Sequence, residues 1–367
     1  MTGATNGQAT EKMEIGLVLQ GGGALGAYEY GAITGLFDLI DEAANNRRDI
    51  TLRVVTGVSI GAINAACVVG AADRGDARKR LDAVWDDFMV DVPYLPPALN
   101  RDLALCSVPH FYAFRSDWLT MPSWTYFYDT HQLLQTLSNH VDFAALNASK
   151  TAFVITAADV ESGVLTRFAN QKVGDTKPTT IEPHHVLASG SIPPQFPWTD
   201  IGAGAALHHY WDGGIVDNTP LGDAYDAFTS TPGVKRLLVV MNLFPQTAKL
   251  PRSLNEVNER LDQLRFGNRL RQDASTARQI NTLISTIEDL VAFAPKPLPD
   301  ALQQQVDKAS AYKLVEPVEI SLNADTVSDN AYSFRDFSRA GILARRNAGR
   351  GIALAALRSH FNSHLTA

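Results

Sequence analysis

Ser59 stands where a nucleophilic serine would be expected. Gly57 and Gly61 flank it in the segment G-V-S-I-G, which has the G-x-S-x-G spacing of a nucleophile elbow. Residues 52–56, rich in β-branched side chains, predict a strand before it, and the small apolar residues 60–72 predict a buried helix after it. This strand–turn–helix context favours a nucleophile over a chance match in a chain with 26 glycines.

A second glycine-rich turn follows the first predicted strand, residues 13–20. It contains Gly21, Gly22 and Gly23, and with Gly26 it satisfies the spacing G-x-G-x-x-G. A dinucleotide site is the weakest of three interpretations, because the next predicted strand lacks the terminal acid that would hold a ribose hydroxyl. The others are a turn needed only for tight packing and an anion cradle of converging N–H groups, which in a hydrolase is an oxyanion hole.

A serine nucleophile needs a base, and Asp212 is the acid that stands out. It precedes Gly213 and Gly214, a pair that indicates a close approach of the backbone to another part of the chain. A lone Asp-Gly is commonly a plain turn, but the residues that follow make a simple hairpin less natural here. None of the nine histidines lies in a recognisable catalytic loop, and His208 and His209 precede this acid rather than follow it.

The three motifs in this order, GGGALG, GVSIG and DGG, resemble those of the patatin-like phospholipases, a family of serine acyl hydrolases. Residues 187–197, LASGSIPPQFP, are similar to the family segment A-S-x-x-I-P-x-x-F-P. Residues 128–130 with Leu133 and Leu137, and the late residues 336–339, resemble a bacterial subgroup with a C-terminal extension. The resemblance covers most of the chain, and the ordered set is much more specific than any single motif.

The resemblance implies a catalytic dyad that needs no histidine. Ser59 matches the nucleophile, and Asp212 matches the base that takes the serine proton directly and returns it to the leaving group. The expected reaction is hydrolysis of a lipid carboxylic ester, as in a phospholipase A or lysophospholipase, through an acyl-enzyme on Ser59. Two alternatives stay open: an esterase with a Ser–His–Asp triad, and a non-catalytic module that binds lipid or acyl groups on the same scaffold.

The resemblance also assigns a role to the glycine-rich turn that begins at Gly21. Gly21, Gly22, Gly23 and Ala24, called the glycine loop below, match the oxyanion loop of the family, and the N–H groups of Gly22 and Gly23 are expected to face the cavity beside the nucleophile. Many members carry Arg or Lys where this chain has Leu25. The difference leaves the backbone donors intact, but it weakens the expectation of an anionic head group.

Composition and element order set the fold class. The 367 residues are 45% hydrophobic, enough for a large core, and the net charge of −7 without a basic run argues against a nucleic-acid partner. Strand, glycine turn and helix alternate, which predicts an α/β fold: a three-layer α/β/α sandwich with a mostly parallel central sheet. No cluster has metal-ligand spacing, so neither a metal nor another cofactor is expected.

We expect a disordered tail over residues 1–12, a catalytic domain over 13–245, and a helical extension over 246–367 packed on the same domain. In the extension, residues 253–291 predict helix in more than one piece, and 334–358 predict a closing helix. The tail lacks the features of a signal peptide, no stretch approaches the ~20 apolar residues that span a bilayer, and two cysteines build no disulfide framework. A cytoplasmic location is expected, peripheral at the membrane, with a lipid ester as substrate; the oligomeric state stays open.

Residues 91–128 form a Pro-rich, aromatic stretch without clear periodicity, and we expect an irregular insertion over one end of the sheet. Five large side chains lie within ten residues: Trp118, Met121, Trp124, Tyr126 and Phe127. One interpretation is that they pack the insertion onto the sheet. The other is that they line the mouth of the serine pocket as a lid or interfacial patch, since Trp and Tyr favour the bilayer interface.

Overall fold

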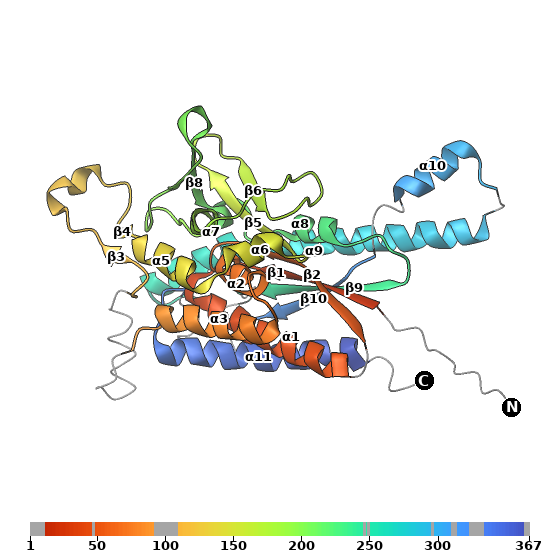
Figure 1. Ribbon diagram of the computed structural model, residues 1–367, viewed down its shortest axis with the longest axis horizontal. Coiled ribbons are helices and arrows are strands. Elements are labelled where there is room, and N and C mark those ends of the chain that lie inside the picture. Colours follow the sequence, from red (N-terminus) through yellow and green to blue (C-terminus); the bar gives the residue numbers. More distant parts are fainter. Residues whose placement is uncertain are drawn as a thin grey trace.

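A computed structural model describes residues 12–45, 48–91, 109–244, 247, 250–294, 297–309, 314–322 and 334–362. The expected tail, apart from Lys12, lies outside the described residues, as do residues 92–108 of the insertion. Figure 1 shows a central sheet with helices on both sides of it.

The sheet has eight strands in the order β10-β9-β1-β2-β5-β8-β7, with β6 paired to β5. Strands β10, β9, β1, β2 and β5 run parallel, while β6 and β8 pair antiparallel with β5, and β7 with β8. The strands are β1 (Lys12–Leu19), β2 (Asp49–Gly57), β5 (Ala152–Asp159), β6 (Leu165–Ala169), β7 (Thr199–Ile201), β8 (His208–Asp212), β9 (Val234–Asn242) and β10 (Glu316–Ser321). A separate ribbon pairs β3 (Ala113–Phe114) with β4 (Tyr128–Asp129).

Both faces of the sheet are buried, because alternate side chains of a strand enter two separate apolar clusters. In β1, Ile15 and Leu17 belong to the larger cluster and Val18 to the smaller one. The larger cluster includes side chains from α1 (Gly26–Asn45), α2 (Ile60–Val69), α3 (Arg74–Phe88), α5 (His131–His140), α6 (Phe143–Ala148), α7 (Pro183–Ser189) and α11 (Arg339–Asn362). The smaller one includes α8 (Leu221–Ala227). The predicted three-layer α/β/α sandwich with a mostly parallel sheet is confirmed.

Helix α11 lies along α1, at the bottom of Figure 1, at a distance only glycines allow. A β-carbon added at Gly31 would lie 1.8 Å from the carbonyl oxygen of Arg346, and one at Gly349 would lie 1.9 Å from that of Tyr28. The end of the chain is therefore packed backbone to backbone against the first helix.

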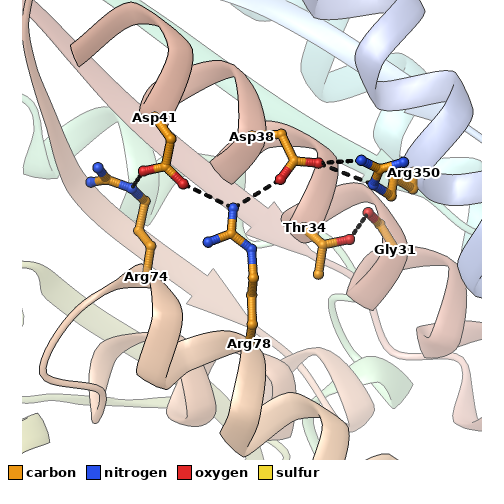
Figure 2. Close-up of polar contacts among 7 residues, drawn as sticks. All are labelled: Gly31, Thr34, Asp38, Asp41, Arg74, Arg78 and Arg350. Atoms are coloured by element: carbon orange, nitrogen blue, oxygen red, sulfur yellow. Dashed lines mark hydrogen bonds and ion pairs between the residues drawn. The ribbon is translucent and has the colours of Figure 1, made fainter. Parts of the chain in front are cut away.

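Ion pairs at the surface fix the helices that flank α1 (Figure 2). Arg78 Nη2 lies 3.0 Å from both Asp38 Oδ1 and Asp41 Oδ2. Arg74 Nε is 2.6 Å from Asp41 Oδ1, and Arg350 Nη2 of α11 is 2.7 Å from Asp38 Oδ2. Partly exposed pairs each contribute little to stability, so this network mainly orients α3 and α11 on α1.

The remaining helices are α9 (Leu254–Phe293) and α10 (Asp300–Ala309). Helix α9 is a single helix of 40 residues, where the sequence predicted more than one piece. Among the helices that the structure describes, none combines the length and the apolar character that crossing a bilayer requires.

Candidate active site

The strand ends and loops at one edge of the sheet surround a cavity of 550 Å³. Ser59, Asp212 and the three glycines of the glycine loop line it, whereas Ala24, the last residue of the loop, is fully buried and does not. Much of the remaining wall is aromatic. In that wall the Phe88 and Phe111 rings are 4.5 Å apart between centroids. A cavity with a few polar groups at one point and apolar walls elsewhere suits a ligand with a long apolar part.

Ser59 lies on the turn between β2 and α2, so the strand and helix predicted around it are both present. Its φ of 55° and ψ of −123° make it the one non-glycine residue with positive φ in the described part of the chain. A β-carbon at Gly57 would lie 2.5 Å from the carbonyl oxygen of Gly61, and one at Gly61 would lie 2.6 Å from that of Leu19. The backbone strain therefore persists only because both flanking residues are glycines.

A second serine fixes the backbone of this turn. The N–H of Ser59 donates to Ser189 Oγ at 3.0 Å, and Ser189 is fully buried at the end of α7. The motif over 187–197 was the only sequence signal for this residue. Its spacing gave no hint that one of its hydroxyls holds the nucleophile turn.

Asp212 ends β8 and is almost completely buried. Its Oδ1 accepts a hydrogen bond from the N–H of Gly214 at 2.7 Å, and a β-carbon at Gly213 would lie 2.4 Å from the carbonyl oxygen of Thr156. Burial raises the pKa of Asp212 to about 7, although hydrogen bonds from the Ser59 side chain and from Gly214 oppose the rise. Such a carboxylate can exchange protons near neutral pH.

Neighbouring elements hold the two ends of the glycine loop. Asn218 binds Gly21 twice, because its Oδ1 accepts from the Gly21 N–H at 2.9 Å and its Nδ2 donates to the Gly21 carbonyl at 3.1 Å. At the other end the N–H of Ala24 donates to the carbonyl of Phe334 at 2.9 Å. The N–H groups of Gly21 and Ala24 are thus already in use.

The two middle residues of the glycine loop have backbone N–H groups that are available as hydrogen-bond donors. No described residue accepts a hydrogen bond from the N–H of Gly22 or Gly23, and both residues line the cavity. Gly23 has a φ of 54°, and a β-carbon there would lie 2.5 Å from the carbonyl oxygen of Phe334. Two backbone donors without partners in an apolar cavity are suited to bind an oxyanion.

The last glycine of the G-x-G-x-x-G spacing has a packing role. A β-carbon at Gly26 would lie 2.5 Å from Ile60 Cγ1, so the glycine allows the first turns of α1 and α2 to touch. Leu25 is buried in the larger apolar cluster.

A buried polar chain under the site was not anticipated from the sequence. Glu29 Oε1 accepts from the N–H of Gln20 at 2.7 Å, and its Oε2 accepts from Asn64 Nδ2 at 3.1 Å. Trp85 Nε1 donates to Asn64 Oδ1 at 3.0 Å. Burial raises the pKa of Glu29 to about 8. This chain joins the start of the glycine loop to α2, and its one sequence signal was an acid within an apolar helix.

None of the described histidines lines the cavity. His208 Nδ1 lies 2.9 Å from Asp159 Oδ2, and His209 Nδ1 lies 2.7 Å from Asp200 Oδ1. These contacts give a Ser–His–Asp triad no geometric support. Within the described ranges, no three His, Cys, Asp or Glu side chains are grouped so that they could hold a metal ion.

The described part of the aromatic insertion divides into two kinds of residue. Phe111 is buried and, with Tyr112 and Phe127, lines the cavity. Trp118 and Met121 are exposed to solvent. Of the five large side chains singled out in the sequence, Phe127 lines the cavity, whereas Trp118, Met121, Trp124 and Tyr126 do not.

Comparison with known proteins places this geometry in a family. Residues 17–225, which include all three motifs, match the family model for patatin-like phospholipases. No curated protein matches the chain. Among solved structures, VipD from Legionella pneumophila aligns over 98% of this chain and 70% of its own at 14% identity, with a TM-score of 0.42. The ExoU-SpcU complex from the type III secretion system of Pseudomonas aeruginosa aligns over 96% and 76% at 15% identity, with a TM-score of 0.30. Because the family model matches more than half of the chain, the protein belongs to the patatin-like phospholipase family.

Proposed function

We propose that the protein is a serine acyl hydrolase that cleaves carboxylic esters of lipids through an acyl-enzyme on Ser59. The observation that carries the proposal is the convergence of three groups in one apolar cavity. These are the elbow serine, the buried Asp212 carboxylate, whose pKa a hydrogen bond from the Ser59 side chain lowers, and the N–H groups of Gly22 and Gly23, from which no described residue accepts a hydrogen bond. Family membership supplies the broader class, a lipid hydrolase.

In the first half-reaction, Ser59 Oγ attacks the ester carbonyl carbon while Asp212 accepts the hydroxyl proton. The carbonyl oxygen becomes an oxyanion, which accepts hydrogen bonds from the N–H groups of Gly22 and Gly23. When the carbon–oxygen ester bond breaks, Asp212 returns the proton to the leaving alcohol. Water then attacks the acyl-enzyme with Asp212 again as base, and the fatty acid leaves.

The walls of the cavity favour a substrate with a long acyl chain. The rings of Phe88, Phe111 and Phe337 pack against one another at centroid distances between 4.5 and 6.3 Å, forming an apolar surface that side-chain packing holds in place. The cavity wall also includes the guanidinium-bearing Arg335. A cation at the wall is compatible with a phosphate head group, so phospholipids or lysophospholipids are the proposed substrates.

Labelling with a serine-directed fluorophosphonate tests the nucleophile directly. We expect covalent labelling that Ser59→Ala abolishes, while Ser138→Ala, a change at an exposed serine of α5, leaves it intact. Absence of labelling in the parent protein would favour the non-catalytic lipid-binding module. If His208→Ala or His209→Ala removed hydrolysis of a lipid panel without unfolding the protein, the triad would replace the dyad.

A further inference from the structure

The segment between β3 and β4 carries large apolar side chains into solvent. Leu119 is 99% exposed, Trp118 60% and Met121 53%; these three residues are called the apolar tip. They lie on a short 3₁₀ helix, η2 (Trp118–Ser123), and Figure 1 shows the segment projecting from the body of the protein beside β3 and β4. Residues 118–128 contain no charged side chain, although 19% of the whole chain is charged. Contiguous exposed apolar side chains of this kind mark interaction surfaces.

The segment around the apolar tip is folded, and its polar side chains contact one another. Arg115 Nε lies 2.9 Å from Asp117 Oδ1, and the same guanidinium stacks over the rings of Trp124 at 4.8 Å and Tyr126 at 4.4 Å. The Trp118 and Trp124 rings are 5.4 Å apart. Because the nearby charges of Arg115 and Asp117 are paired, the apolar tip can leave water without burying an unpaired polar group.

The base of the segment forms part of the cavity wall. Phe114 pairs with Tyr128 in the β3–β4 ribbon, and the N–H of Tyr128 donates to the carbonyl of Gln195 at 2.9 Å. Tyr128 and Gln195 both line the cavity that contains Ser59, as does Phe127. The segment that carries the tip is therefore anchored in the wall of the candidate active site, through the β3–β4 ribbon and Phe127.

We propose that the apolar tip inserts into the surface of a phospholipid bilayer and so turns the mouth of the cavity toward the membrane. The inference rests on the proposed function, since a lipid ester substrate lies in such a bilayer. Trp prefers the interface, while Leu and Met side chains enter the acyl region. Continuity with an apolar cavity selects a lipid surface over a protein partner, because an acyl chain can then move from bilayer to cavity without crossing water.

The charges of the protein indicate that the proposed membrane contact is apolar and not electrostatic. The net charge is −7, and the tip segment has no cation beyond Arg115, which is paired with Asp117. Attraction to anionic lipid is therefore weak, and the binding is apolar. Adding anionic lipid to the vesicles should not strengthen partitioning at 0.1 M salt, whereas a basic patch would bind anionic vesicles and lose that attraction at 1 M salt.

Vesicle binding without turnover tests the proposal. In a Ser59→Ala background, the full chain is co-sedimented with phosphatidylcholine vesicles. Leu119→Ser should lower the partition coefficient roughly tenfold, because it removes one fully buried leucine from the bound state, and adding Met121→Ser should lower it further. The matched control is Phe293→Ser, at a residue 90% exposed at the end of α9. That end adjoins α10, on the opposite side of the molecule from β3 and β4 (Figure 1), so the control should bind like the parent.

Three outcomes would overturn the proposal. In the first, Leu119→Ser binds vesicles as strongly as the parent. In the second, Phe293→Ser loses as much vesicle binding as Leu119→Ser. In the third, the parent does not bind vesicles but forms a concentration-dependent dimer that Leu119→Ser abolishes. Turnover of a short soluble ester, measured with Ser59 intact, separates this proposal from the catalytic one. A protein that binds vesicles but hydrolyses no ester would refute the proposed function alone, and one that hydrolyses the ester but ignores vesicles would refute only the membrane contact.

Discussion

In the proposed mechanism, the protonation state of Asp212 controls the chemistry. Burial raises its pKa to about 7, and only the deprotonated form can accept the Ser59 proton. We expect kcat/KM for a soluble ester to rise about tenfold per pH unit below neutrality and to level off above about pH 7. A profile that is already flat from pH 5 upward would mean that the base titrates as an ordinary carboxyl, and that Asp212 is not in the proposed environment.

The same shift affects stability. An unfolded Asp titrates near 3.8, so between that pH and about 7 the folded protein holds a proton on Asp212 that the unfolded chain has lost. The contribution of Asp212 to the free energy of unfolding therefore falls as pH rises through this window and stays low above it. Asn at this position carries no such charge, and the variant lacks this pH dependence.

Asp212→Asn separates catalysis from folding. It preserves shape but removes the proton acceptor, and we expect a loss of at least ~10³-fold in ester hydrolysis. At pH 8 the variant should melt no lower than the parent, because burying an amide avoids burying a charge. Retention of a tenth of the activity would remove Asp212 from the mechanism.

At the scale of single residues, what the sequence could predict depended on distance along the chain. Ser59 and Asp212 could be predicted as candidates because elbow and turn chemistry places glycines at fixed offsets from them. Asn218 escaped notice because its partner Gly21 lies 197 positions away. Glu29 was missed for a similar reason. Helical periodicity does not predict that this buried acid accepts a hydrogen bond from the N–H of Gln20.

The glycine loop is an element that strongly limits substitution. Gly23 has positive φ, and a β-carbon there would strike the Phe334 carbonyl at 2.5 Å, so Gly23→Ala must displace the loop. Loss of one oxyanion donor costs about 3 kcal/mol, so we expect kcat to fall more than 100-fold while KM changes little. Gly222→Ala on α8, where a β-carbon meets nothing within 4 Å, is the matched control. An equal rise in KM would point to a binding role for the loop instead.

Two helices differ from prediction because of contacts the sequence does not reveal. Helix α9 continues through Gly267, where a β-carbon would lie 2.8 Å from Phe244 Cβ, so this glycine serves close packing without ending the helix. Helix α11 begins at Arg339, five residues later than expected. The residues before it, from Phe334 to Ser338, instead run past the glycine loop, where Phe334 binds Ala24.

At the scale of the whole molecule, the C-terminal region completes the site. It supplies β10 at the sheet edge, α11 on α1, and Phe334 and Phe337 in the cavity wall. Arg345 of α11 pairs with Asp336 at 3.2 Å, both fully buried, and donates to the Asp336 carbonyl at 2.7 Å. We therefore propose that residues 246–362 belong to the same domain as 13–245. Sequence patterns predicted that the extension packs there, but not that it forms part of the cavity.

The α1–α11 contact should therefore control stability and activity together. In Gly31→Ala the new β-carbon would lie 1.8 Å from the Arg346 carbonyl, and because backbone cannot move aside locally, the two helices must separate. Overpacking of this kind costs roughly 1–3 kcal/mol of unfolding free energy. Separation also shifts α11, and with it Arg345 and the Phe334 carbonyl that holds Ala24, so ester turnover should fall as well.

Gly351→Ala provides the comparison within the same helix. A β-carbon at Gly351 meets nothing within 4 Å, and alanine favours the helix over glycine by about 1 kcal/mol, so this variant should be at least as stable as the parent and fully active. Denaturant unfolding and turnover of a soluble ester measure both quantities. If Gly31→Ala lost stability but kept full turnover, α11 would stabilise the fold without positioning the glycine loop. If it kept both, the close approach of the two helices would itself be wrong.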